Sequence, residues 1–575
     1  MLRLRRLAFC AALLACGTAA ARSDLSFATL TSGSYPALVD FSAFVPDAGA
    51  TAPTNRFEGV LRLRFAGTLA HHTLHVDPSE VKAQQVAVAQ TWPRDFAYEF
   101  VQQGDALVPV RRGAIPSTHG WWELILEPGR VWNEAGDHGY TRASIPFALQ
   151  EKNANCTHNG VLMFLFRSDG SVSKTAMQIA SETCQYLQLD LWGLLETHYR
   201  PGKVGGRDMA LTTYASEVRA RWPTRTLAQL HTDHPELNIE SLAIGASAGR
   251  TVHGLFVGGI NYLSACDTRS GAYPYCDQID LPSYSLAKSA FAATALMRLE
   301  QMHPGSASQL ISAHVPECNI PAWTGVTFAN ALDMTTGNYD SAADEADEDA
   351  GKTNGLFLPL DHAHKIRFSC TAYPHKAAPG TQWVYRSSDI YVLGTAMAQF
   401  LRTLPGHEQD DLYTDLIVAQ LYAPLGLSPT THVTRRTYDK VAQPFAAWGL
   451  TFQPGDIAKL GRFLGADHGA INGQQLLDPK MLDQALQRDP SSPGQPVTDL
   501  PEFRYHYGFW ARNIRSMLGC AHDTWVPFMS GYGGITVVLF PNGVVYFNFA
   551  DDGQVASWDW GTVAPEARKL GDFCR

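Results

Sequence analysis

The stretch that decides how the chain folds is Pro282-Ser-Tyr-Ser-Leu-Ala-Lys-Ser-Ala-Phe-Ala-Ala-Thr-Ala-Leu-Met-Arg-Leu299. From Ser285 onward the pattern predicts a helix that is apolar almost all round, and such a helix is buried. Lys288 therefore lies where an ammonium group is costly, so it must find partners or lose its proton. Ser285 lies one helical turn earlier, on the same face. A lysine of lowered pKa can accept the hydroxyl proton, and the free N–H groups of a first helical turn can stabilise an oxyanion.

The Ser-x-x-Lys spacing alone is not specific, because the chain contains it twice more, at Ser79–Lys82 and at Ser171–Lys174. The first pair lies in a polar context, and the second follows a Ser-Asp-Gly turn signal. Neither opens a buried helix, so both are interpreted as chance. For Ser285 the alternative is a solvated serine beside a lysine that keeps its ammonium group in water.

The first residues, 1–21, are typical of a secretory signal peptide. Arginines precede an apolar run, and Ala19-Ala-Ala21 ends it. The run is too short to span a bilayer permanently, so no transmembrane helix is expected after its removal. The prediction is an exported protein, periplasmic or extracellular. Leu13-Leu-Ala-Cys-Gly17 loosely resembles a lipoprotein cleavage box, which leaves lipidation of Cys16 as an alternative.

Charge and cysteine content both fit export. Removing residues 1–21 takes away three arginines and no acids, so the formal net charge falls from −10 to −13. An acidic chain without basic clusters is a poor partner for nucleic acid or an anionic membrane. Ten cysteines less Cys10 and Cys16 leave eight, an even number suited to an oxidising compartment. Eight cysteines allow 105 pairings, so the sequence does not fix the connectivity. Proximity favours Cys156–Cys184 and Cys266–Cys276, and elimination adds Cys318–Cys370 and Cys520–Cys574 as expected pairs.

At 575 residues the chain is long enough for two domains. Residues 24–205 contain short apolar runs broken by Gly, Pro and Asn, which predicts a mostly β N-terminal domain without an assigned role. Arg200–Gly206 is the expected linker, and the second domain covers residues 215–575. The runs expected to be strands include 59–65, 121–126 and 160–166. The histidines at 71, 72 and 75 have no acid or cysteine at ligand spacing, so a surface strand is predicted there.

Three further patterns are interpreted as structural. Gly245-Ala-Ser-Ala-Gly249 matches the nucleophile elbow, with Ser247 as the rival nucleophile. However, β-branched residues follow where the elbow needs a helix, so a hairpin turn is predicted. The six acids between Asp340 and Gly351 predict a solvated loop, with calcium binding as the alternative. Asp361-His-Ala-His364 is too sparse for a metal site. We expect no metal and no cofactor.

Two later segments carry the remaining polar chemistry. After the Pro379-Gly380 turn, the sequence predicts a short aromatic strand and then an apolar helix, with Tyr385 and Ser387 at the corner between them. Near the C-terminus, the small residues that follow Met529 lead into a predicted strand over 535–540. Glycines at such a point let a ligand approach the backbone.

Taken in order, Ser285-x-x-Lys288, Tyr385-x-Ser387 and the glycine-rich strand resemble the serine β-lactamase and penicillin-binding-protein superfamily. The most similar branch is the class C-like one, with its esterases, D-peptidases and 6-aminohexanoate-oligomer hydrolases. Ala447–Gly461 and Gly473–Leu477 also resemble that branch. The resemblance covers roughly residues 240–575. It implies an α/β (α+β) fold, in which an antiparallel sheet is flanked by helices and an all-helical subdomain adjoins it.

The resemblance also implies a role for each site residue. Ser285 would be the acylated nucleophile, Lys288 its base, and Tyr385 the proton donor to the leaving group. The oxyanion hole would combine the N–H of Ser285 with one from the glycine-rich strand, Gly531 or Tyr532. Substrate-binding positions would be Ser387, Ser530, Gly531, Tyr532 and Gly533.

The chain departs from the family pattern at two positions. Ser387 stands where the family has an asparagine, and a hydroxyl cannot match the paired donor and acceptor of an amide. Met529-Ser-Gly531 lacks the cation that faces a substrate carboxylate, although Arg386 is a candidate replacement. We therefore expect a serine hydrolase acting on a small-molecule or peptide-like ester or amide rather than an efficient β-lactamase. The alternative is a non-catalytic exported binding or scaffold protein that retains the fold.

Overall fold

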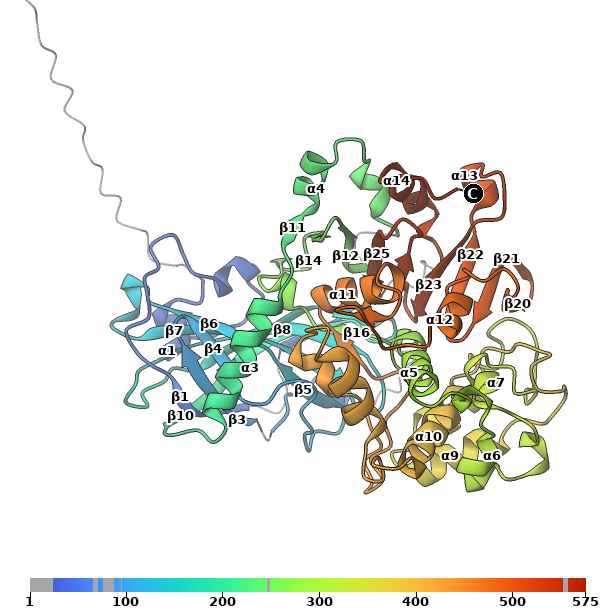
Figure 1. Ribbon diagram of the computed structural model, residues 1–575. Helices are drawn as coiled ribbons and strands as arrows, with labels where there is room; N and C mark the ends of the chain where they lie inside the picture. Colours follow the sequence, from blue (N-terminus) through green and yellow to red (C-terminus); the bar gives the residue numbers. More distant parts are fainter. Residues whose placement is uncertain are drawn as a thin grey trace, which may run out of the picture.

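The computed structural model describes residues 24–65, 71–75, 87–94, 96–245, 249–551 and 557–574. The expected signal segment with Cys16, the Ser79–Lys82 pair and Ser247 lie outside these residues. Within them the chain forms two large sheets and a group of helices, with the N-terminal sheet on the left of Figure 1 in blue and cyan.

The N-terminal sheet contains ten strands among the described residues, in the order β1-β3-β4-β6-β7-β8-β9-β10-β2, with β5 paired to β7. Because β1 pairs with both β3 and β10, the sheet closes on itself. The strands are β1 (Glu58–Phe65), β2 (His71–Leu74), β3 (Ala97–Gln103), β4 (Ala106–Pro109), β5 (Trp122–Leu126), β6 (Gly129–Trp132), β7 (Thr141–Glu151), β8 (Thr157–Phe166), β9 (Thr175–Thr183) and β10 (Leu189–Pro201). The mostly β character predicted for this region is confirmed.

Strand β8 is buried along its whole length, because both faces of the sheet are covered. Alternate residues point to opposite faces of a strand. Leu162, Phe164 and Phe166 therefore belong to a hydrophobic cluster inside the closed sheet. Met163 and Leu165 belong to a second cluster, which is shared with the C-terminal part of the chain.

The second sheet has nine described strands in the order β11-β13-β12-β25-β24-β23-β22-β21-β20, and only β11 and β13 pair in parallel. The first strands of this part therefore pair with the last ones. The bounds are β11 (Thr224–Thr226), β12 (Arg250–Val257), β13 (Ile260–Leu263), β20 (Gln495–Val497), β21 (Leu500–His506), β22 (Phe509–Asn513), β23 (Trp525–Gly531), β24 (Ile535–Leu539) and β25 (Val545–Ala550).

Helices lie against this second sheet and beside it (Figure 1). Helix α5 (Thr294–Met302) continues a π-helical turn, Lys288–Ala293, and lies between the sheet and a helical group. That group contains α6 (Ile311–His314), α7 (Phe328–Leu332), α8 (Asn354–Phe357), α9 (His362–Thr371) and α10 (Ser387–Thr403). The other described helices include α1 (Phe27–Thr31), α3 (Arg207–Ala220), α4 (Leu227–Asp233), α11 (Pro454–Gly465), α12 (Pro479–Ala485), α13 (Arg515–Leu518), α14 (Val563–Lys569) and a π-helix, Leu412–Tyr422. The predicted α/β architecture, an antiparallel sheet flanked by helices with a helical group beside it, is confirmed.

Two local predictions are wrong. Ser285 lies in a turn before the helix rather than inside it. Tyr385 follows irregular chain and not a strand, although the predicted helix does begin at Ser387. The hairpin turn predicted around Ser247 falls on residues 246–248, outside the described residues, and Gly249 directly precedes β12. The elbow around Ser247 is nevertheless excluded, because a strand stands where a helix would be needed.

The two parts of the chain are joined by ion pairs to buried carboxylates as well as by the shared cluster. Arg269 contacts Glu182 on β9 at 2.6 Å and Asp190 on β10 at 2.7 Å. Arg435 likewise pairs with Glu123 on β5. The four predicted disulfides are all present: Cys156–Cys184, Cys266–Cys276, Cys318–Cys370 and Cys520–Cys574.

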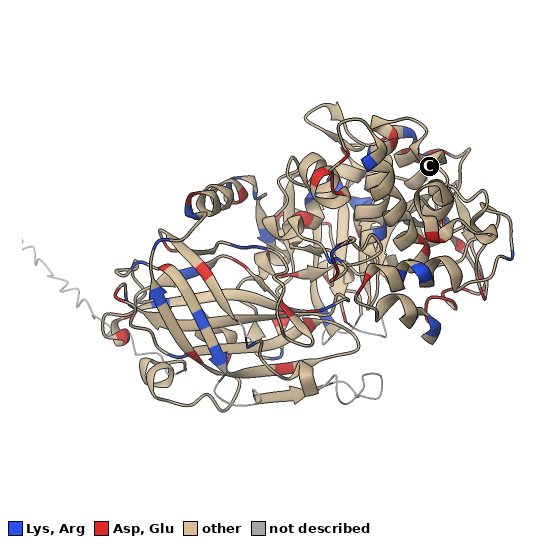
Figure 2. Ribbon diagram, turned by 90° about the horizontal axis from the view of Figure 1, so that it is seen from below, with Lys and Arg blue, Asp and Glu red and all other residues tan. Residues whose placement is uncertain are grey.

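Charged residues are scattered over both parts of the molecule, with basic and acidic side chains interspersed (Figure 2). None of the described helices combines the length and the apolar content that crossing a membrane requires.

Candidate active site

The turn that carries Ser285 is set by the chain immediately before it. Strand β16 (Leu281–Pro282) pairs with β17 (Thr451–Phe452), which anchors the approach. Tyr284 then adopts a left-handed backbone with φ 40°, which is rare for a bulky residue and recurs at functional sites. The turn leaves Ser285 partly exposed just before the buried helix.

Lys288 occupies the π-helical turn and is 1% exposed. Its Nζ donates to Ser285 Oγ at 2.8 Å and to Ser387 Oγ at 2.9 Å. Burial lowers the pKa of Lys288 to about 8, although the carboxylates of Glu348 and Glu345 act in the opposite direction. A fraction of Lys288 is therefore neutral near pH 7, which allows it to act as a base.

The ring of Tyr385 faces the Lys288 ammonium group, whose Nζ is 4.6 Å from the centre of the ring. Three aromatic side chains enclose the ring: Trp383, Tyr505 and Trp510. Burial raises the pKa of Tyr385 well above its usual value, and a hydrogen bond with Ser285 only partly offsets this. Tyr385 is therefore protonated at neutral pH, and it can donate a proton where Lys288 accepts one.

Ser387 begins α10, and its contacts differ from those predicted. Besides accepting from Lys288, its hydroxyl donates to Glu348, and its backbone N–H donates to Glu348 Oε2 at 2.8 Å. A carboxylate at a helix N-terminus satisfies a free N–H group and interacts favourably with the helix dipole. Ser387 is buried between Lys288 and Glu348, so the structure gives it a partner on the protein instead of an open position.

The acidic segment between Asp340 and Gly351 is not the solvated loop that its composition predicts. Glu348 reaches Ser387, and Asp347 is buried, with its carboxylate accepting from the N–H groups of Asp340 and Ser341. Burial and the neighbouring carboxylates raise the pKa of Glu345 to about 7. The sequence signal for Glu348 was present as a run of acids, but nothing local to that run links it to α10.

The glycine-rich strand β23 runs past the nucleophile turn. A Cβ at Gly531 would lie 2.8 Å from Ser283 O, so the two backbones are in close contact. The hydroxyl of Ser530 pairs with that of Ser557, while Tyr532 is 46% exposed and Gly533 has φ 87° in the turn to β24. The predicted substrate-binding positions 530–533 therefore lie on one continuous segment beside Ser285.

Neither of the two positions considered for a cation, 529 and 386, supplies one to the site. Met529 is not only uncharged but buried, on the face of β23 opposite to Ser530. Arg386 is 1% exposed, pairs with Asp389 and lies over the ring of Tyr373. The replacement role considered for Arg386 is therefore wrong.

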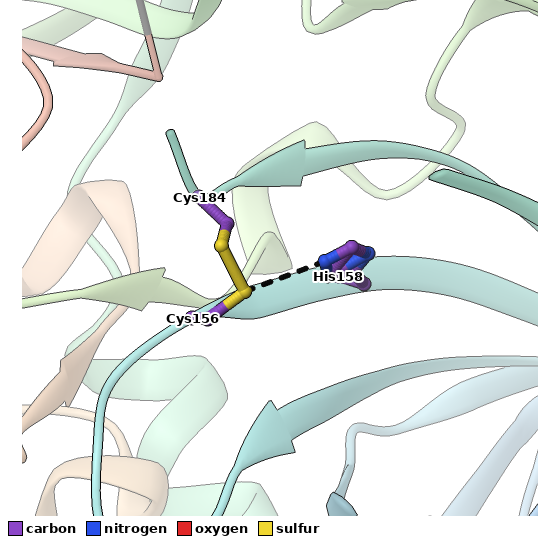
Figure 3. Close-up of side chains that lie close together, drawn as sticks. All are labelled: Cys156, His158 and Cys184. Carbon is purple, nitrogen blue, oxygen red and sulfur yellow. Dashed lines mark hydrogen bonds between the residues drawn. A yellow bond between two sulfur atoms is a disulfide. The ribbon is translucent and has the colours of Figure 1, made fainter. Parts of the chain in front are cut away.

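In the described part of the chain, one group of potential metal ligands comes together outside this site: Cys156, His158 and Cys184 (Figure 3). The two cysteines form a disulfide, and His158 Nε2 lies 3.5 Å from Cys156 Sγ. Because a metal binds thiolates and a disulfide has none, this group is a cross-link rather than a ligand set.

Residues 282–552 match the beta-lactamase family model. No curated protein matches the chain. Among solved structures, the chain resembles a D-stereospecific amidohydrolase from Streptomyces sp. (15% identity, 57% of this chain and 96% of that one, TM-score 0.40) and a penicillin-binding-protein homologue from Caulobacter crescentus (15%, 58% and 96%, 0.40). A class C beta-lactamase is similar at 14% identity over 62% of this chain and 95% of that one, with a TM-score of 0.39. On the family match, residues 282–552 belong to the serine β-lactamase and penicillin-binding-protein superfamily.

Proposed function

We propose that the protein is an exported serine hydrolase that works through an acyl-enzyme on a small-molecule or peptide-like ester or amide. The observation that carries this proposal is the 2.8 Å contact between Lys288 Nζ and Ser285 Oγ within a buried site. A lysine whose pKa is lowered to about 8 and which contacts a partly exposed serine is the arrangement expected of an activated nucleophile.

The proposed reaction begins when Ser285 Oγ bonds to the substrate carbonyl carbon and its proton passes to Lys288 Nζ. The carbonyl electrons move to oxygen, where the N–H of Ser285 and that of Gly531 or Tyr532 stabilise the charge. Collapse breaks the bond to the leaving group, to which the Tyr385 hydroxyl gives a proton while it regains one from Lys288. Water then attacks the acyl-enzyme by the same steps and releases the acid and free Ser285.

The charges around the site favour a substrate without a carboxylate next to the scissile bond. Met529 and Arg386 supply no cation, and Glu345 and Glu348 bring carboxylates close to Lys288. A charge-assisted hydrogen bond from a cation to a carboxylate contributes roughly 1.5–3 kcal/mol. Its loss corresponds to about one to two orders of magnitude in rate at roughly 1.4 kcal/mol per decade.

The test compares p-nitrophenyl butyrate with nitrocefin on one preparation. We expect measurable ester hydrolysis, a kcat/KM for nitrocefin lower by at least about tenfold, and loss of both activities in Ser285→Ala. A fluorophosphonate probe should label Ser285 in the wild type. Labelling at another serine, or ester hydrolysis that survives Ser285→Ala, would contradict the proposed nucleophile.

The second candidate function is a non-catalytic binding or scaffold protein with this fold. It is favoured if the folded wild type neither hydrolyses either substrate nor reacts with the probe. Export is tested separately, because N-terminal sequencing of the secreted protein should begin after residue 21, or at Cys16 if that residue is lipidated. Four disulfides support an oxidising compartment.

A further inference from the structure

A side chain of the N-terminal sheet reaches the turn that presents Ser285. Asn155 lies between β7 and β8 and is buried. Its Oδ1 accepts from Tyr284 N at 3.2 Å, from Gly449 N at 2.7 Å and from Ser283 Oγ at 3.3 Å. Its Nδ2 donates to Leu450 O at 3.3 Å. All four bonds go to residues of the C-terminal part.

These bonds act on the one strained residue of the nucleophile turn. Tyr284 needs support from its surroundings to keep a φ of 40°, since a left-handed backbone costs a bulky residue of order 1–3 kcal/mol. Asn155 accepts from the N–H of this same residue, directly before Ser285. Through Gly449 and Leu450 it also holds the segment that leads into β17, the partner strand of β16.

Asn155 is itself held firmly. The next residue, Cys156, is cross-linked to Cys184 at the end of β9 (Figure 3). Thr157 Oγ1 donates to Asn155 O at 2.8 Å. Close by, Asn159 and Asp280 exchange two hydrogen bonds of 2.9 and 3.0 Å, so β8 also holds the chain entering β16. The contact is therefore between two rigid elements.

We propose that Asn155 is a positioning residue for Ser285, and that the N-terminal sheet is a required part of the catalytic scaffold. The inference rests on the proposed function, because it assigns Asn155 an effect on the acylation of that serine. Asn155 touches no substrate. It acts by holding Tyr284 and thereby the direction in which the Ser285 hydroxyl points.

The Asn155→Ala variant leaves the buried N–H groups of Tyr284 and Gly449 without their acceptor. The turn should relax, and displacement of a reacting atom by about 1 Å can cost on the order of 100-fold in rate. We expect kcat for p-nitrophenyl butyrate to fall about 10- to 100-fold and KM to change less than about twofold. Acylation of Ser285 by the fluorophosphonate probe should slow by a similar factor.

The matched control is Asn133→Ala in the full chain. Asn133 is also an asparagine of the N-terminal region, but its side chain bonds only to Thr54 and Thr141 of that same region. This variant should keep kcat, KM and the acylation rate. Circular dichroism and thermal unfolding of both variants separate a lost fold from a displaced serine.

The outcomes distinguish a failure of the proposed function from a failure of the positioning role of Asn155. A folded wild type that neither hydrolyses the ester nor labels at Ser285 refutes the proposed function itself. An active wild type with a folded Asn155→Ala variant of unchanged kcat, or with the loss confined to KM, refutes the positioning role alone.

If Asn155→Ala does not fold, Asn155→Asp keeps the acceptor for both N–H groups and should retain KM and at least about a tenth of kcat. Loss through KM in that variant overturns the proposal.

Discussion

Lys288 determines the pH range in which the site can work, because only its neutral form accepts the Ser285 proton. With a pKa of about 8, the neutral fraction falls about tenfold for each pH unit below 8. Acid pH therefore removes activity and alkaline pH restores it. The kcat/KM for a neutral ester should rise through pH 6 to 8 and then level off above 8.

The carboxylate of Glu348 affects the pKa of Lys288, so its removal should shift the pH dependence of the reaction in a predictable direction. The carboxylate raises the pKa of Lys288, so Glu348→Gln should lower that pKa and move the acid limb of kcat/KM to lower pH. Asp340→Asn is the matched control, because Asp340 lies on the same segment but pairs with the exposed Lys352. A limb that stays in place or moves to higher pH in Glu348→Gln would show that another group titrates.

The local Ser-x-x-Lys pattern predicted Ser285 and Lys288, and the resemblance to the β-lactamase superfamily added Tyr385 to the group. The sequence did not point to Glu348 or Asn155, whose partners are far away along the chain. An acid in an acidic run is usually solvated, and Asn155 stands in Asn153-Ala-Asn155, which by composition is an ordinary turn between strands. Asn155 has a different role because the chain between β7 and β8 packs against the nucleophile turn, a contact that the sequence does not show.

At the level of elements, β23 and the nucleophile turn fit together only because residue 531 is glycine. In Gly531→Ala the new Cβ would lie 2.8 Å from Ser283 O and 3.1 Å from Ile535 Cβ, and backbone cannot give way as a flexible side chain does. We expect a loss of about 1–3 kcal/mol in stability from overpacking and a slower reaction of Ser285 with the fluorophosphonate probe.

The same substitution at Gly465 is its control. That residue ends α11, and a Cβ there would meet only Leu539 Cβ at 3.9 Å. Gly465→Ala should leave the probe reaction unchanged and keep or raise stability by up to about 1 kcal/mol. Equal effects of the two alanines, measured by chemical unfolding and by labelling rate, would exclude the close approach at Gly531 as the cause.

The regular strands and helices were largely predictable from the sequence, but the irregular segments were not. Short apolar runs broken by Gly, Pro and Asn located β1, β5 and β8, while the apolar run after Ser285 located α5. A π-helical turn such as Lys288–Ala293 uses the same residue types as an α-helix, so composition cannot distinguish them. The chain before Tyr385 is aromatic as a strand would be, but its rings pack around one another instead of pairing along a backbone.

Across the whole molecule, the two parts depend on buried charges that meet at their boundary. Arg269→Ala takes one partner away from the buried carboxylates Glu182 and Asp190, and because the Arg269 side chain itself is 30% exposed we expect a loss of roughly 1–3 kcal/mol of unfolding free energy. Arg56→Ala is the comparison, because its pair with Glu58 is exposed and should contribute below about 1 kcal/mol. Denaturant unfolding of both variants measures the difference. Similar losses would mean that the boundary does not rely on Arg269.

The pairing of β12 with β25 has a consequence for the order in which the protein can take shape during synthesis. All the described strands of the N-terminal sheet lie within residues 58–201, and the sheet has a hydrophobic cluster of its own, so it can form before the rest of the chain joins it. By contrast, β12 pairs with β25, so Val252 gains its partner Phe549 only when the C-terminal strand is present. The contacts that hold Asn155 within the first sheet therefore all come from residues that precede the serine turn. A transcript cut short before Val545 would yield a finished first sheet with β12 as a bare edge, which is a template for aggregation.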